Sequence, residues 1–111
     1  MAIFLVRMEH PDGPAWNTHV LEHVRYLQQL INQGRLLASG PITGARLRAG
    51  FLIMLATNRE EAEAMIEADP FHREGLISDL SIEAWDPLFG QLGAYSSQRY
   101  PEELKALVHD Q

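Results

Sequence analysis

The sequence predicts an α+β fold in which two helices cover one face of a four-stranded sheet. Four short apolar runs typical of strands alternate with two amphipathic, helix-like segments along the first 86 residues. Their order is strand, helix, strand, strand, helix, strand, and the length of 111 residues suits one domain. Because this βαββαβ order is that of a ferredoxin-like sandwich, we expect one face of the sheet to be left without helices.

The first strand and the first helix are predicted from their composition and their flanking residues. Residues 2–8 are rich in Ile, Phe, Leu and Val, and turn residues at 10–14 end the strand. Asn17 or Thr18 is placed to cap a helix that continues to Gln33. The apolar residues of this helix recur at the spacing of a buried stripe: Val20, Val24, Leu27 and Ile31.

The second half of the domain follows the same logic. Gly40-Pro41 is expected to bulge or end the second strand, because proline cannot donate to a sheet. Asn58 and Glu61 resemble a capping box at the start of a helix, which is predicted to end at Asp69 because a proline follows. The remaining elements are predicted as strands at residues 36–42, 50–56 and 76–85 and a terminal helix at 101–108.

Charge and composition exclude several classes of function. Nine Lys and Arg against fifteen Asp and Glu give a net charge of −6, which argues against nucleic-acid binding. The absence of cysteine excludes disulfide scaffolds, thiolate catalysis and cysteine-ligated metal centres. No apolar run approaches the ~20 residues of a membrane span, and the first ten residues lack a signal-peptide pattern. We therefore expect a cytoplasmic protein that binds no membrane, and no nucleotide motif points to a cofactor.

Asp69 and His23 are the first candidate site residues. Asp69 continues the apolar stripe of the second helix at i+7 from Ala62, and it lies at a predicted helix C-terminus, where negative charge is disfavoured. It is therefore predicted either to turn inward at a functional site or to swing out and cap the following turn. His23 lies on the flank of the first helix's apolar stripe. An imidazole N–H can satisfy a buried carboxylate, and such a pair makes a general base.

A metal site is the alternative use of the histidines. His19 and His23 lie at i and i+4 on one helix face, within a stretch that matches the H-x-x-E-H motif of inverted zinc proteases. His72 or Asp69 could complete a three-ligand site. Because the pattern is short, His19 is preferred as an exposed first-turn residue and no metal ligand is assigned.

Further residues are candidates for contact with a substrate. At Ser39-Gly40-Pro41 the glycine permits close approach and the serine hydroxyl can donate a hydrogen bond, although a plain β-bulge explains the same residues. Arg7 is a candidate for binding an oxyanion, because the first strand is expected to end near the cleft. Arg46 and Arg48 either attract an anionic ligand or keep a hairpin loop soluble.

Taken together, these residues resemble the YCII-related family. The similarity covers residues 1–86 and rests on motifs in the family's order and spacing: His23-Val24-x-x-Leu27, Gly34-Arg35-Leu36-Leu37, Ser39-Gly40-Pro41, Glu61-Ala62, Ala68-Asp69-Pro70-Phe71 and Gly75. The resemblance implies a fold of the dimeric α+β barrel type. Residues 87–111 fall outside it, and we expect this tail, with its short helix, to cover the cleft or the dimer partner.

The resemblance also implies a function. In the family a His–Asp dyad lies in a cleft, which would be His23 and Asp69 here, with Pro70 holding the aspartate in place. One characterised kind of member is a dehydrochlorinase of a chlorinated hydroxyhydroquinone, in which the dyad starts the reaction by deprotonating the ring hydroxyl. This sequence has Val20-Leu21-Glu22 where the family frequently has Arg-Pro-Ala, so no specific substrate is implied.

Three functional hypotheses follow. The first is a cofactor-free acid/base enzyme, a lyase or isomerase of a small cyclic or phenolic compound, with His23 as the base and Asp69 orienting it. The second is a non-catalytic ligand-binding or accessory dimer, in which the pair only satisfies buried polar groups. The third is a metal-dependent enzyme that uses His19, His23 and His72.

The open face of the sheet is expected to carry a homodimer interface. Large apolar side chains left without helices above them would be exposed to water unless a second subunit covered them. The side chains predicted on this face are Phe4, Phe51 and Trp85.

Overall fold

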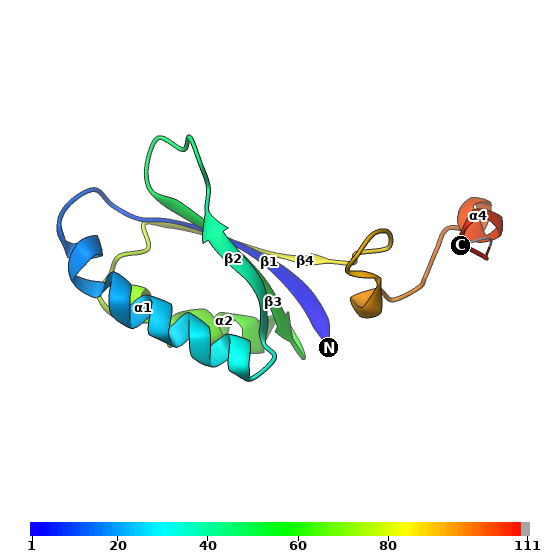
Figure 1. Ribbon diagram of the computed structural model, residues 1–111, viewed down its shortest axis with the longest axis horizontal. Helices are drawn as coiled ribbons and strands as arrows, with labels where there is room; N and C mark the ends of the chain where they lie inside the picture. Colours follow the sequence, from blue (N-terminus) through cyan, green and yellow to red (C-terminus); the bar gives the residue numbers. More distant parts are fainter. Residues whose placement is uncertain (110–111) are drawn as a thin grey trace.

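The computed structural model describes residues 1–109, and it confirms the predicted βαββαβ order. Four strands form one antiparallel sheet in the order β2-β3-β1-β4 (Figure 1). The strands are β1 (Ala2–Glu9), β2 (Leu36–Pro41), β3 (Ala49–Ala56) and β4 (Asp79–Trp85). The fold is therefore the α+β, ferredoxin-like arrangement that the sequence predicts.

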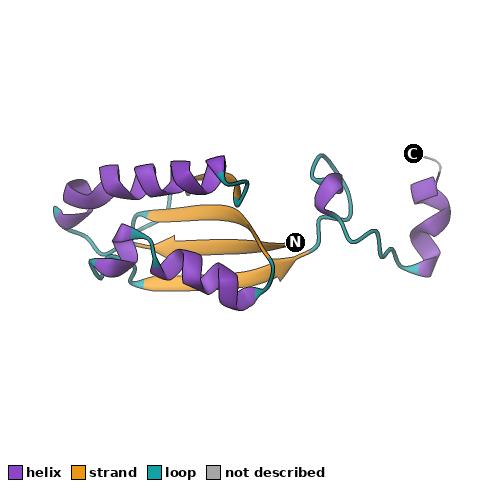
Figure 2. Cartoon of the chain, turned by 90° about the horizontal axis from the view of Figure 1, so that it is seen from below, coloured by secondary structure: helices purple, strands orange, loops and turns teal. Residues whose placement is uncertain are grey.

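Helices α1 (Ala15–Asn32) and α2 (Arg59–Glu67) lie on the same side of the sheet, and a short helix, α3 (Pro70–Arg73), follows α2 (Figure 1; Figure 2). Alternate residues of each strand point toward these helices, so the core forms between the two layers. The core cluster draws residues from all four strands and from both long helices: Phe4, Val6, Met8, Leu30, Leu36, Leu52, Met54, Ala56, Ala62, Met65, Ile66 and Ile82.

The start of α1 differs from the prediction. The helix begins at Ala15, and neither Asn17 nor Thr18 is its cap. Pro14 already has helical dihedral angles, and its carbonyl accepts a hydrogen bond from Thr18 N at 3.2 Å. Because a proline is preorganised to start a helix, the two polar residues are left inside the first turn.

The buried face of α1 is also rotated relative to the predicted stripe. Val24 and Ile31 are exposed, whereas Leu30 is buried. The Tyr26 hydroxyl donates a hydrogen bond to the Met65 carbonyl of α2. A polar contact thus helps to set the side of α1 that faces α2, which apolar periodicity alone does not reveal.

The N-terminus of α2 is as predicted, and its C-terminus is not. The Asn58 side chain accepts a hydrogen bond from Glu61 N at 2.9 Å, as expected of an N-cap. The helix ends at Glu67, two residues before the predicted end, and Asp69 adopts an extended conformation. Asp69 is the N-cap of α3, a helix that the sequence analysis missed.

The face of the sheet opposite the helices is open. Phe51 and Trp85 lie on this face and are 36% and 41% exposed, as predicted. The prediction for Phe4 is wrong, because Phe4 shares the helix-covered side of β1 with Val6 and is only 5% exposed. The homodimer interface on this face stays a prediction.

Residues 87–109 run from the end of β4 away from the sheet and the helices (Figure 1). They contain two 3-10 turns, η1 (Gly93–Tyr95) and η2 (Glu102–Leu104), and helix α4 (Lys105–His109), the last two close to the predicted helix at 101–108. The molecule is consequently 54 Å long but only 29 by 20 Å across. The division into a domain at 1–86 and a tail at 87–111 is our proposal, and residues 110–111 lie outside the described part.

Within residues 1–109, every helix is too short or too polar to span a membrane.

Candidate functional site

An imidazole from α1 meets a carboxylate at the start of α3. His23 Nδ1 lies 2.9 Å from Asp69 Oδ1 and 2.8 Å from Asp69 Oδ2, so one N–H is shared between the two oxygens. Asp69 is 2% exposed, and the His23 side chain is mostly buried. The structure therefore joins the two residues that the sequence analysis paired.

Asp69 has a local reason to be where it is. As the N-cap of α3 it accepts a hydrogen bond from Phe71 N at 2.9 Å, and the buried Pro70 occupies the first turn of that helix. The carboxylate turns inward, as one prediction has it, and caps the following turn, as the other has it, but it does not swing out into solvent. The expectation of an unfavourable helix C-terminus is wrong, since the carboxylate faces the free N–H groups at a helix start.

Phe71 holds the imidazole from the side. The rings of His23 and Phe71 are stacked, with centroids 4.1 Å apart and an interplanar angle of 14°. Phe71 is fully buried, so it forms a fixed wall. The ring of His23 is therefore held at one edge by Asp69 and on one face by Phe71.

These contacts decide the tautomer of His23. A carboxylate only accepts hydrogen bonds, so the Nδ1 atom of His23 must carry the proton that Asp69 binds. The other ring nitrogen, Nε2, has no hydrogen-bond partner among residues 1–109, and it is not sealed from solvent-accessible space. Neutral His23 thus offers a lone pair at Nε2, which is what a general base requires.

Nε2 has a cavity to act in. A cavity of about 710 Å³ opens between α1, α3 and the β2–β3 hairpin, and His23 and Phe71 line it. Most of its lining is apolar, with contributions from the following residues: Met8, Val20, Val24, Leu27, Ile42, Leu47 and Leu52. Such a volume and lining suit a small organic ligand.

The other residues predicted at the site divide into two groups. Ser39, Gly40 and Pro41 all line the cavity, and Pro41 is the last residue of β2. Arg7 is not among the cavity residues. It pairs in register with Phe51 across the sheet, and its guanidinium donates to Glu9 at 2.9 Å. Both β1 residues alternate with core-facing ones, so they project to the open face of the sheet.

The sequence analysis missed a second histidine in the cavity. His10 follows β1 directly, is 5% exposed and lines the same cavity. Its Nδ1 lies 2.7 Å from the Leu76 carbonyl oxygen, and its ring centroid is 4.8 Å from that of Phe71. Burial lowers the pKa of the His10 imidazole, against the bond to Leu76, which raises it. Its position at the end of a strand was the available signal, but the neighbouring turn residues concealed it.

A cation lies over an aromatic ring at the rim of the cavity. The Arg48 guanidinium is 4.1 Å from the centre of the Trp16 ring, and both residues line the cavity, as does Arg46. Arg48 NH1 also donates to Asn17 Oδ1 at 3.3 Å. The two arginines are thus placed to attract an anionic ligand, one of the two uses that the sequence left open.

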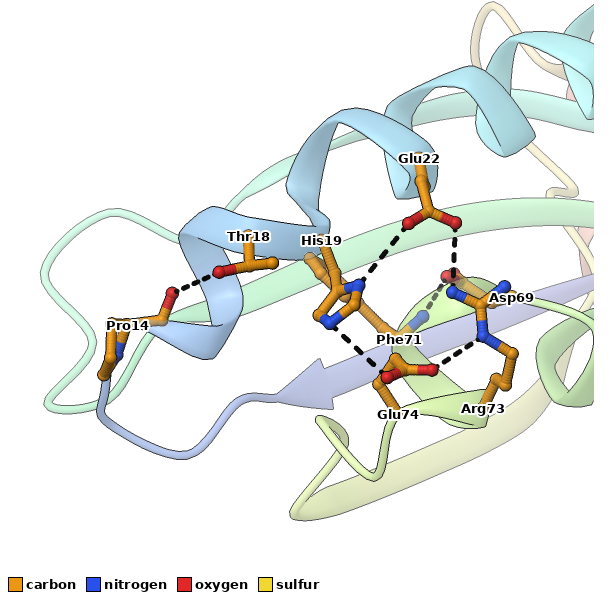
Figure 3. A network of polar contacts seen from close by, with 8 residues as sticks. All are labelled: Pro14, Thr18, His19, Glu22, Asp69, Phe71, Arg73 and Glu74. Atoms are coloured by element: carbon orange, nitrogen blue, oxygen red, sulfur yellow. Dashed lines mark hydrogen bonds and ion pairs between the residues drawn. The ribbon is translucent and has the colours of Figure 1, made fainter.

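Outside the cavity, ion pairs tie α1 to α3 (Figure 3). Glu22 accepts from Arg73 at 3.0 Å, and Arg73 also binds Glu74 at 2.8 Å. His19 lies 3.4 Å from Glu74 and 3.5 Å from Glu22. The hydrogen bond from Arg73, and then the nearby His19, hold the pKa of the Glu22 carboxyl below its ordinary value. This network holds together the two helices that carry the dyad.

The structure does not assemble the alternative metal site. His19 is bound in the outer network, His23 in the dyad, and His72 lines a separate, smaller cavity beside Arg59. Within residues 1–109, no group of three or more His, Asp or Glu side chains is arranged to hold a metal ion. The hypothesis that joins these three histidines is therefore not supported by their positions.

Comparison with known proteins gives one family match and several similar folds. The model of the YCII-related domain matches residues 1–86. No curated protein matches the chain. Among solved structures, 5-chloro-2-hydroxyhydroquinone dehydrochlorinase from Burkholderia phenoliruptrix AC1100, in complex with 2,5-dihydroxybenzoquinone, is similar with a TM-score of 0.66 and 27% identity. The match covers 76% of this chain and 93% of that chain.

Two more distant structures were also found. An uncharacterized NIPSNAP domain protein from Burkholderia xenovorans has a TM-score of 0.46 and 16% identity, over 78% of this chain and 94% of that chain. A dimeric ferredoxin-like protein of unknown function from Jannaschia sp. CCS1 has a TM-score of 0.49 and 16% identity, over 78% of this chain and 99% of that chain.

Proposed function

Because this chain belongs to the YCII-related domain family, we propose that it is an enzyme that processes a small molecule by acid/base chemistry without a cofactor. The substrate is a small cyclic or phenolic compound, and the reaction is that of a lyase or an isomerase. The observation that carries this proposal is the His23–Asp69 pair, of which His23 lines an apolar cavity. The similar dehydrochlorinase, bound to a quinone, supports the choice of a phenolic substrate.

His23 is the proposed base. Its Nε2 atom takes a proton from a ring hydroxyl, and the resulting imidazolium is stabilised by the carboxylate on Nδ1. Asp69 orients the ring and keeps the proton on Nδ1, while Pro70 and the bond from Phe71 N fix the carboxylate. Ser39, with Gly40 and Pro41, is proposed to contact the substrate oxygen from the β2 side of the cavity.

A dehydrochlorination illustrates what this geometry can do. When a chlorinated hydroquinone becomes a quinone, two O–H bonds and one C–Cl bond break, and one C–H bond forms at the carbon that held chlorine. One hydroxyl proton is thereby returned to the ring, and the other is released with chloride. His23 is suited to this sequence, because an imidazole that takes a proton from oxygen can return it to carbon.

Turnover assays with a matched histidine control test the proposal. Chlorohydroquinone and other substituted hydroquinones and lactones are screened for chloride release and for the absorbance of a quinone product. His23→Gln is expected to abolish turnover, whereas His72→Gln, which removes an exposed histidine outside the cavity, leaves it unchanged. If His23→Gln turns over every responsive substrate at the wild-type rate, the proposal fails. Binding without turnover in the wild type supports the ligand-binding alternative.

We also propose that two copies associate through the open face of the sheet. Phe51 and Trp85 are both exposed there, on the two strands that flank β1, and a second copy would remove such large apolar side chains from water. The described part of the tail, residues 87–109, leaves the domain next to Trp85, so in a dimer it can reach the partner subunit. This assignment is independent of the acid/base chemistry.

A further inference from the structure

His10 stands on the same cavity wall as the proposed base. The buried ring of Phe71 contacts both imidazoles, with its centroid 4.1 Å from His23 and 4.8 Å from His10. Both histidines line the cavity. They are therefore close enough together for one small ring-shaped ligand to meet both.

The contacts of His10 decide its tautomer. The Leu76 carbonyl oxygen, 2.7 Å away, is an acceptor only, so the Nδ1 atom of His10 must be the donor. Nε2 of neutral His10 is then unprotonated. It has no partner among residues 1–109, and it is not sealed from solvent-accessible space. The buried imidazole of His10, which lines the cavity, thus has an unprotonated Nε2 with a lone pair.

The surroundings of His10 keep it in this neutral form. Burial is the largest effect and lowers the pKa of the imidazole. The Arg48 guanidinium, and a proton on His23 when that ring carries one, lower the pKa of His10 further, whereas the Leu76 bond and the Asp69 carboxylate raise it. At neutral pH the ring is thus uncharged, with Nδ1 donating to the Leu76 carbonyl and Nε2 able to accept a hydrogen bond.

We propose that His10 is a substrate-binding residue that accepts a hydrogen bond from a second hydroxyl of the ligand, so that the site selects planar rings with two hydroxyl groups. One hydroxyl meets Nε2 of His23 and the other meets Nε2 of His10. This inference rests on the proposed function in that it assigns a substrate class to the same cavity. It also fits dehydrochlorination, in which both O–H bonds of a chlorinated hydroquinone break as chloride leaves and a C–H bond forms on the ring.

Binding of a matched ligand pair tests the inference without turnover. Hydroquinone and 4-methoxyphenol differ only in that one hydroxyl is methylated, and their dissociation constants are measured anaerobically by calorimetry. The chain has no cysteine, so quinone adducts at thiols do not interfere. Wild-type protein is expected to prefer hydroquinone by about tenfold, the worth of one net hydrogen bond. The His10→Phe variant is expected to lose this preference, while His72→Gln keeps it.

A second measurement guards against a folding defect in the variant. In wild-type protein, the ¹⁵N resonance of His10 Nε2 is expected to shift when hydroquinone saturates the site, and to shift less with 4-methoxyphenol. An unchanged resonance, an equal affinity for the two ligands in wild-type protein, or no hydroquinone binding at millimolar concentration would each overturn the inference. So would a preference that persists in folded His10→Phe. A preference without turnover would leave this inference standing while the proposed enzymatic function fails.

Discussion

Replacing Asp69 by Asn tests the dyad while preserving its shape. Asp69 is 2% exposed and accepts hydrogen bonds from His23 Nδ1 and from Phe71 N. The oxygen of an Asn side chain can keep the bond from Phe71, but the amide nitrogen that then faces His23 is a donor. To accept that hydrogen bond, Nδ1 of His23 must be unprotonated, and the neutral ring then carries its proton on Nε2. The nitrogen that faces the cavity is then no longer a base.

The magnitudes follow from these contacts. Asp69→Asn exchanges one charge-assisted hydrogen bond for a neutral one, so the free energy of unfolding should fall by about 1–2 kcal/mol. Asp69→Ala leaves two buried donors without an acceptor and should lower it by about 3–5 kcal/mol. On any substrate found for the wild type, Asp69→Asn should lower kcat by about 100-fold or more, because the wrong tautomer predominates.

Urea unfolding and ¹⁵N NMR measure the two effects separately. Asp79→Asn is the matched control, because it removes one carboxylate charge at an exposed position, where within residues 1–109 the side chain accepts a hydrogen bond from Leu80 N alone. The control should leave both stability and the His23 resonances near their wild-type values. The reasoning is refuted if His23 in Asp69→Asn still carries its proton on Nδ1, or if the variant is as active as the wild type.

Three further predictions concern the fold, the pH dependence of stability and the assembly. Asn58→Ala removes the cap of α2 and should lower the free energy of unfolding by about 1 kcal/mol in urea, whereas Asn32→Ala, at an exposed helix end, should not. Because the pKa of His10 is lowered in the folded state, the unfolded chain binds a proton there first as the pH falls. The free energy of unfolding should therefore decrease from about pH 6.5 downward and level off below the folded-state pKa. In His10→Phe, urea titrations at several pH values should lack this part of the slope, and an identical slope would contradict the assignment. Phe51→Glu places a charge on the open sheet face and should halve the mass found by light scattering, while a wild-type mass equal to one chain would remove the dimer proposal.

Apolar periodicity predicted the fold because it reports which residues must leave water. It predicted the strands to within a few residues, and the separate capping-box pattern of Asn58 and Glu61 predicted the cap of α2. It failed where polar contacts decide the outcome. The side of α1 that faces the core is set in part by Tyr26, whose hydroxyl bonds to the backbone of α2, and not by the most apolar residues of α1. Phe4 was assigned to the wrong side because strand alternation does not say which face the helices will cover.

The site was predictable where a residue broke a local rule. Asp69 drew attention as a carboxylate at an apolar position, and His23 was the nearest group able to satisfy it. His10 broke no such rule, since a histidine before a proline-containing turn is unremarkable in sequence. Its contact with Phe71 forms only when the chain folds. Arg7 was expected at the cleft only because its strand ends near it, and no feature of its own sequence position supported that expectation. Proximity of its strand to the cleft says nothing about the face on which a side chain lies.

The segment from Asp69 to Phe71 makes the fold and the proposed chemistry inseparable. Asp69 caps α3 and binds His23, and Phe71 supplies both the capped N–H and the ring against which His23 and His10 rest. Any change that loosens this turn must therefore disturb the carboxylate, the aromatic wall and both cavity nitrogens together. The outer pair joins Glu22 of α1 to Arg73 of α3 and contacts neither imidazole of the cavity. Loss of that pair should thus act only through the position of α3, shifting both histidines alike, whereas Asp69→Asn acts on one nitrogen of one ring.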